Sequence, residues 1–142
     1  MQDFSLYKKS KDLIGHSAAI YSLDFDGIYL YSAAGDRFVT RWDLKTGTQD
    51  KFAIQFKNTP FCIALFSQNT HLAVGLENGD MHFFNIAERK EVKFFKQHKT
   101  GIFSILVLCL PPSNFVFKNA TTISIAKLKS RIQVINTLLS CT

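Results

Sequence analysis

The stretch GHSAAIYSLDFDGIYLYSAAGDRFVTRWDL, which runs from Gly15 to Leu44, decides how this chain folds. It opens with Gly15-His16 and closes with Trp42-Asp43, and three short runs of aromatic and aliphatic residues lie between these dipeptides. Such residues favour β-strands. Gly and Asp residues separate the runs and supply the backbone conformations that tight reversals require. The stretch therefore predicts three antiparallel strands joined by short turns.

The chain continues this alternation of strands and turns as far as Phe95. A fourth strand is expected to complete the first unit, and four further strands form a second unit. The expected strands cover residues 20–25, 28–32, 38–42, 52–56, 61–66, 72–75, 81–86 and 92–95. Asn78-Gly79, between two of them, is a strong hairpin signal. Two antiparallel four-stranded meanders follow, so the predicted fold class is all-β.

A constant sequence interval relates the two units. Trp42 corresponds to Phe84 (84 − 42 = 42), and Asp36 corresponds to Asn78 (78 − 36 = 42). A further equal step leads from Phe84 to Ala126 (126 − 84 = 42), which indicates a third and weaker unit. Four-stranded propeller blades repeat every ~40–45 residues. The interval therefore favours blades of a β-propeller.

The two ends of the chain are less regular. Residues 1–12 alternate loosely and predict an edge strand blunted by lysines. Residues 98–105 repeat the start of the first unit, but no Gly-Asp turn follows them. Residues 122–128 fit a strand, whereas residues 130–140 fit either a strand or a short C-terminal helix. The predicted division is an edge strand of a preceding or closing blade over 1–12, a first blade over 13–56, a second over 57–97, and a degenerate third blade with a tail over 98–142.

These features resemble the WD-repeat β-propeller family. The resemblance rests on Gly15-His16 followed at a set distance by Trp42-Asp43 (42 − 16 = 26), and on a second copy of the pattern at 78–86. It is firm over residues 13–105 and weak over 106–135. Propellers close with 4–8 blades, and the chain holds about three repeats (142/42 is about 3.4). It is interpreted as a fragment or truncated product of a longer propeller, with assembly of several copies and an open array as alternatives.

The resemblance assigns a hydrogen-bonded tetrad to His16, Ser32, Asp36 and Trp42. A buried indole N–H needs an acceptor, which Ser32 would supply, and His16 would connect Ser32 to Asp36. In the second blade the same interval gives Asn58, Val74, Asn78 and Phe84. Val and Phe cannot form such a network, so packing is expected to replace it there.

A Ser, a His and an Asp in one unit also suggest nucleophilic catalysis. Ser32, however, lies in mid-strand and is not on a Gly-x-Ser-x-Gly turn. The sequence marks no oxyanion hole or substrate pocket, both of which a triad needs. The four histidines lack metal-ligand spacing. We therefore expect no enzyme, no metal and no cofactor.

Composition limits the remaining classes of function. The formal net charge is +6, and residues 106–142 carry four basic side chains and no acidic one. This segment suggests, as an alternative function, electrostatic binding of RNA or another anionic partner, although no Lys/Arg block is dense. The three cysteines form no CxxC pair, and no apolar run approaches the ~20 residues of a membrane helix. A reducing, cytoplasmic setting without membrane contact is expected.

The resemblance implies a scaffold, because propellers of this family present the loops of one rim to protein partners. In this chain the corresponding loops lead into the first strand of each blade or join its second and third strands. They carry Arg37, Lys57, Glu77 and Lys99, which we expect to touch a protein or peptide partner. The end strands of an incomplete array also predict self-association.

Overall fold

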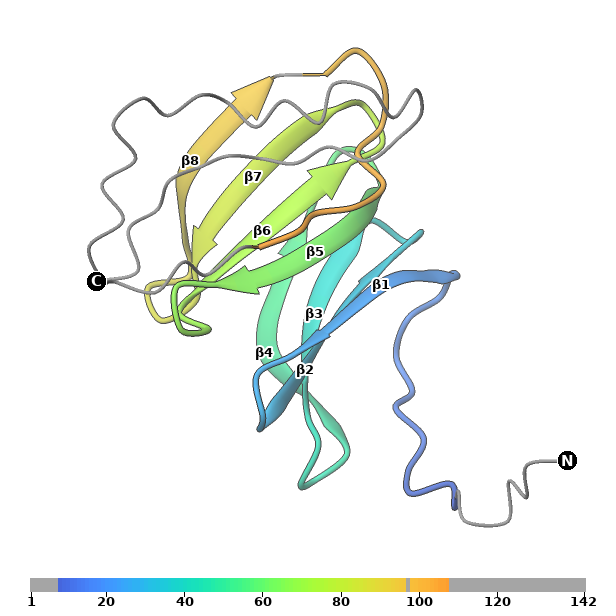
Figure 1. Cartoon of the computed structure of the whole chain (residues 1–142). Coiled ribbons are helices and arrows are strands. Elements are labelled where there is room, and N and C mark those ends of the chain that lie inside the picture. The colour runs from blue at the N-terminus through green and yellow to red at the C-terminus, as the bar shows by residue number, and fades with distance from the viewer. Residues whose placement is uncertain (1–7, 97, 108–142) are drawn as a thin grey trace, which may run out of the picture.

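A computed structural model describes residues 8–96 and 98–107, whose strands form two four-stranded antiparallel sheets (Figure 1). The first sheet contains β1 (Ile20–Phe25), β2 (Tyr29–Ala34), β3 (Phe38–Asp43) and β4 (Thr48–Gln55). The second sheet contains β5 (Pro60–Phe66), β6 (His71–Leu76), β7 (Asp80–Asn85) and β8 (Lys90–Lys96). Strands adjacent in sequence are adjacent in each sheet. The predicted all-β fold and its eight strands are confirmed.

Only β4 departs clearly from its predicted bounds, since it begins at Thr48 and not at residue 52. The reason is the tightness of the turn that precedes it. Gly47 adopts φ 79°, and its N–H donates to the carbonyl of Asp43 at 2.8 Å. The chain has therefore reversed by Thr48, which already pairs with Asp43 across the ladder.

The strand ladders show that two different offsets relate the blades. Leu30 pairs with Trp42, and Leu72 pairs with Phe84, so the second and third strands keep the predicted offset (72 − 30 = 84 − 42 = 42). In the first strand, Leu23 lies opposite Ser32 as Ile63 lies opposite Val74, and the offset is 63 − 23 = 40. The turn between the first two strands is therefore longer in the second blade.

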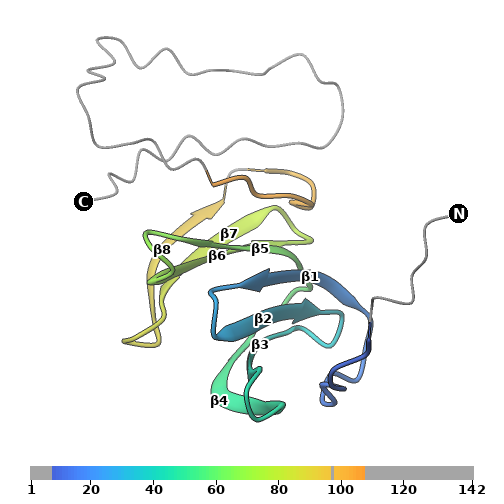
Figure 2. The same ribbon diagram turned by 60° about the horizontal axis from the view of Figure 1, so that its bottom comes forward.

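The two sheets, which form two blades, pack face to face (Figure 2). Their shared core consists of Tyr31, Ala33, Val39, Phe52, Phe56, Ile63, Leu65, Leu72, Val74, Leu76, Phe84 and Ile86. Burial of each large aliphatic side chain contributes about 1.5–3 kcal/mol. The stacking of the two blades is therefore driven mainly by apolar contact.

Polar contacts fix the register between the blades. β5 is an edge strand of its sheet, and buried N–H groups of such a strand need acceptors. The side chain of Ser22 accepts a hydrogen bond from Ile63 N–H at 3.1 Å, and that of Asp24 accepts one from Leu65 N–H at 2.6 Å. Two side chains of β1 thus accept the hydrogen bonds that an adjacent strand would otherwise accept from β5.

Residues 98–107 lie on the side of the second sheet that faces away from the first (Figure 2). Ile102 is buried against Cys62, Ala73, Met81 and Phe83, and its N–H donates to the carbonyl of Leu76 at 3.1 Å. Residues 98–107 themselves are not assigned to a strand. The remainder of the predicted third blade, including 122–128 and 130–140, lies outside the described residues.

The predicted edge strand over 1–12 is not formed in residues 8–12, the part of it that the structure describes. The ammonium group of Lys11 instead donates to the carbonyls of Leu44, at 3.2 Å, and Lys45. This contact ties the segment to the turn after β3 through a side chain and not through a ladder. Across the described residues we find no helix with the length and hydropathy needed to cross a membrane.

Gly79→Ala should detach the segment 98–107 from the second blade. Gly79 has φ 85°, and a Cβ there would lie 2.2 Å from the carbonyl oxygen of His98. The left-handed backbone alone costs a non-glycine residue about 1–2 kcal/mol, and the clash adds to this cost. We expect faster hydrogen exchange at the Ile102 amide, measured by NMR.

Gly27→Ala is the matched control for that substitution. Gly27 also has a positive φ, 102°, but nothing lies within 4 Å of the added Cβ. The control should lose global stability without selective exposure of Ile102. Equal exchange at Ile102 in both variants would contradict the close approach of the segment to Gly79.

Candidate functional site

Four side chains of the first blade form a continuous hydrogen-bonded chain. The indole N–H of Trp42 donates to Ser32 Oγ at 2.7 Å, and Ser32 Oγ lies 2.7 Å from His16 Nε2. His16 Nδ1 lies 2.8 Å from Asp36 Oδ2. A neutral imidazole protonated on Nδ1 satisfies all of these contacts, because it donates to Asp36 and accepts from the Ser32 hydroxyl. The chain ties the segment before β1 to β2, to β3 and to the turn between them.

Thr40 is a fifth member that the sequence reasoning missed. Its hydroxyl lies 3.0 Å from Ser32 Oγ and 3.0 Å from His16 Nε2. The signal was available, since alternation along β3 places Thr40 on the same sheet face as Trp42. Ser32 Oγ is therefore within hydrogen-bonding distance of Trp42, Thr40 and His16, and these three contacts fill its hydrogen-bonding capacity.

The environment of Asp36 favours its ionised form. Burial by itself raises the pKa of this carboxyl group. Hydrogen bonds from His16 and from the backbone N–H groups of Phe38 and Ser17 outweigh burial and hold the pKa of Asp36 below its ordinary value. The network therefore ends in a carboxylate that also accepts hydrogen bonds from the backbone N–H groups of Ser17 and Phe38.

This geometry makes the Ser, His and Asp of the first blade a structural network. Ser32 is only 1% exposed, and the Trp42 indole occupies its hydroxyl oxygen. A nucleophilic Ser needs an approach path for a substrate carbonyl and an oxyanion hole beside it. Trp42, which donates to that oxygen, is itself only 3% exposed, so the Ser32 hydroxyl is not open to a substrate.

An aromatic cluster takes the place of the network in the second blade. Phe56 contacts His82 and Phe84 edge-on, with ring centroids 5.4 and 5.8 Å apart. His82 and Phe84 hold the positions that Thr40 and Trp42 hold in the first blade (82 − 40 = 84 − 42 = 42). The residue in the place of His16 is thus Phe56 (56 − 16 = 40), and the predicted Asn58 is wrong. The cause is the shorter offset of the first strand.

The predicted partner-binding residues all lie on one rim, which we define as residues 35–37, 57–60, 77–80 and 98–101. Each of the four side chains is exposed. The carbonyl of Arg37 accepts the N–H of Phe56 at 2.9 Å, next to Lys57. Glu77 N–H donates to the carbonyl of Thr59 at 2.9 Å. Backbone contacts therefore connect neighbouring loops of the rim.

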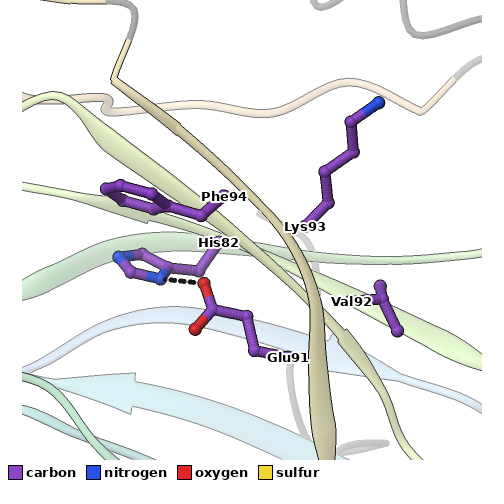
Figure 3. A pocket seen from close by; sticks show the side chains of 5 residues that line it. All are labelled: His82, Glu91, Val92, Lys93 and Phe94. Carbon is purple, nitrogen blue, oxygen red and sulfur yellow. Dashed lines mark hydrogen bonds and ion pairs between the residues drawn. The ribbon is translucent and has the colours of Figure 1, made fainter.

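A shallow depression on the outer edge of the second blade is lined by His82, Glu91, Val92, Lys93 and Phe94 (Figure 3). His82 Nδ1 lies 2.8 Å from Glu91 Oε1, and the Phe94 ring centroid lies 4.6 Å from that of His82. Structural zinc needs four ligands and catalytic zinc at least three. Within 8–96 and 98–107, no three His, Cys, Asp or Glu side chains are grouped to hold a metal.

The buried thiol of Cys62 has little nucleophilic reactivity. Burial raises the pKa of Cys62 to about 12, so the reactive thiolate is scarcely populated near neutral pH. Its Sγ donates to the carbonyl of Ile102 at 3.1 Å. Cys62 therefore acts as a packing residue beneath the segment 98–107.

Comparison with solved structures identifies the class of fold. The chain matches a crystal structure of the WD40 repeats of RRP9 with a TM-score of 0.58 and 22% sequence identity, over 63% of this chain and 29% of that chain. It matches a structure of U3-55K with a TM-score of 0.58 and 21% identity, over 63% of this chain and 30% of that one. The two sheets are therefore blades of the WD40 β-propeller fold, as the sequence predicted.

The chain spans about three tenths of the length of these two structures. No protein-family model and no curated protein matches it. The likeness thus concerns the fold alone, and the function has to be argued from the residues of this chain.

Trp42→Ala should destabilise the first blade more than Phe84→Ala destabilises the second. Removing either ring from a packed core costs about 3–5 kcal/mol. Trp42→Ala in addition removes one of the hydrogen bonds to the buried Ser32 hydroxyl, which adds about 0.5–1.5 kcal/mol. Urea unfolding followed by circular dichroism measures both values. A Trp42→Ala protein that unfolds like the parent would contradict the structural role of the network.

The free energy of unfolding should fall in acid partly through Asp36. Because its pKa is lower in the folded chain than in the unfolded one, its stabilisation is complete at neutral pH. It is lost as the pH falls below about 4 toward the folded pKa. Asp36→Asn should flatten this loss, as measured by Trp42 fluorescence in urea at several pH values. Asp50, whose pKa is also lowered, keeps its own contribution in the variant and supplies the remaining acid dependence.

Proposed function

We propose that this chain is a binding scaffold that presents its rim to a protein or peptide partner. The observation that carries the proposal is the geometry of the rim, where exposed charged side chains stand on turns held by backbone hydrogen bonds. A surface ordered before binding loses little conformational entropy when a partner binds. Loops positioned by a rigid scaffold are where binding residues concentrate.

Arg37 illustrates how the rim is ordered in advance. It adopts φ 70°, a conformation that non-glycine residues rarely occupy. Gly79 holds the corresponding position in the second blade (79 − 37 = 42). The Arg37 N–H donates to the carbonyl of Ala34 at 3.1 Å, and its carbonyl accepts the N–H of Phe56. The turn is therefore closed on both sides of the residue while the side chain remains exposed.

The charges of the rim specify the chemistry of the partner. Among the exposed charged side chains of the rim, Arg37, Lys57 and Lys99 are cationic and Glu77 is anionic. The two other acids of these loops, Asp36 and Asp80, are half-buried. A complementary peptide carries acidic side chains with one basic residue opposite Glu77. Such complementarity sets specificity and the rate of association more than affinity. The partner we infer is therefore an acidic segment of a protein.

Affinity capture with rim variants tests this function. Arg37→Glu and Glu77→Lys should each reduce capture of the same partner bands, whereas Lys51→Glu, an exposed change on β4 away from the rim, should not. Each capture is repeated at roughly 50 and 200 mM salt, a range over which electrostatic binding changes strongly. Truncating a strong interface residue typically costs about 2 kcal/mol or more, so losses should exceed about tenfold.

The salt series separates the scaffold from the electrostatic alternative. Binding of RNA through the basic segment 106–142 would weaken linearly in log salt and would be indifferent to Arg37→Glu and Glu77→Lys. That combination of results would contradict the rim proposal. Loss of partner bands in both rim variants but not in Lys51→Glu would support it.

A further inference from the structure

One face of the first blade exposes side chains whose counterparts in the second blade are buried. We define this back face by Ile20, Leu23 and Phe25, which are 52%, 55% and 50% exposed. In the register of the first strands (63 − 23 = 40), their counterparts are Pro60, which is fully buried, Ile63, at 6%, and Leu65, at 8%. In the second blade, these side chains are buried because the first blade packs against them. Within residues 8–96 and 98–107, the back face therefore has the surface of a blade interface but no neighbouring blade.

The segment 98–107 carries the opposite half of such an interface. Ile105 and Val107 are partly buried against the second blade, as Ile63 and Leu65 are buried against the first. The alternate residues Ser104 and Leu106 are exposed. We define Ser104 and Leu106 as the front of the segment.

The register of the existing interface places Ser104 where Ser22 stands in the first blade. The intermediate position is Cys62 in the second blade (62 − 22 = 40 and 104 − 62 = 42). Ser22 accepts the N–H of Ile63 at 3.1 Å across the interface.

The same register predicts the contacts of the segment with another first blade. Ser104 would accept the N–H of Leu23, which is the counterpart of Ile63. Leu106 would then cover the apolar side chains of the back face.

A row of aromatic rings shows that the segment already keeps this register within the chain. Tyr21 contacts Phe61 edge-on with centroids 5.3 Å apart, and Phe61 stacks on Phe103 at 5.0 Å. The three rings are equivalent in the repeat (61 − 21 = 40 and 103 − 61 = 42). The segment 98–107 therefore packs on the second blade in the same register in which the second blade packs on the first.

We propose that the back face of the first blade binds the front of the segment 98–107 of a second copy of this chain, in the register of the existing blade interface. The contact is head to tail, because two different surfaces meet. Heterologous contacts of this type produce rings when the rotation closes and open assemblies when it does not. The proposal goes beyond the rim function and uses a different surface.

Sedimentation velocity of the full chain over a concentration series tests the assembly. The mean mass should rise with concentration, and Leu23→Asp, which buries a charge in the contact, should raise the dissociation constant roughly tenfold or more. Val92→Asp is the control, since Val92 is 52% exposed on β8 and away from the back face. Trp42 fluorescence verifies that each variant is folded. A monomer at every concentration would overturn the proposal.

Disulfide trapping tests the direction of the contact even if Leu23→Asp fails to fold. Leu23→Cys and Ser104→Cys chains are prepared separately with Cys109 and Cys141 changed to Ser, and are then mixed under mild oxidation. Head-to-tail contact should give a mixed disulfide between the two chains. Cross-linking of Leu23→Cys chains to one another without the mixed product would indicate a symmetric contact and would overturn the proposal.

Discussion

The structure depends on covering the apolar side chains on both faces of the second sheet. The second sheet places Ile63 and Leu65 on one face and Met81 and Phe83 on the other, and both sets are buried. The first sheet supplies the cover on one side and the segment 98–107 supplies it on the other. A four-stranded sheet with apolar side chains on both faces is not stable alone, so blades of this kind exist only in stacks.

The two blades use different interactions to attach the segment before the first strand to the third strand. Each must hold the chain that precedes its first strand against its third strand. The first blade does so with directional bonds from Trp42 through Ser32 to His16, whereas the second uses the contact of Phe56 with Phe84. Buried polar networks fix a unique geometry but are costly when one member is missing. Aromatic packing tolerates more variation, which explains how the second blade keeps its shape without the tetrad.

The sequence predicted the strands well because alternation and turn chemistry are local properties, and the relation of Trp42 to Phe84 follows from them. The predicted 42-residue interval failed for the first strand of the second blade, which is followed by a longer turn in which Ser67, Gln68 and Asn69 all adopt left-handed backbone. A uniform period cannot reveal such a change. The role of Thr40 was also missed, because it depends on where a hydroxyl lies relative to side chains from other elements. Alternation along β3 places Thr40 on the same face as Trp42, but it does not give the distance of the Thr40 hydroxyl from Ser32 and His16.

The rim and the blade faces are separate surfaces, and this separation lets one chain use both. The rim is built from turns at the ends of strands, while the faces are built from side chains that project sideways from strands. Stacking another blade on Leu23 and Phe25 therefore covers neither Arg37 nor Glu77. An assembly formed through the faces would instead repeat the rim charges once for each copy of the chain. Repeated sites on one assembly raise avidity without any new contact at each site, so the proposed assembly would also multiply the surface proposed to bind.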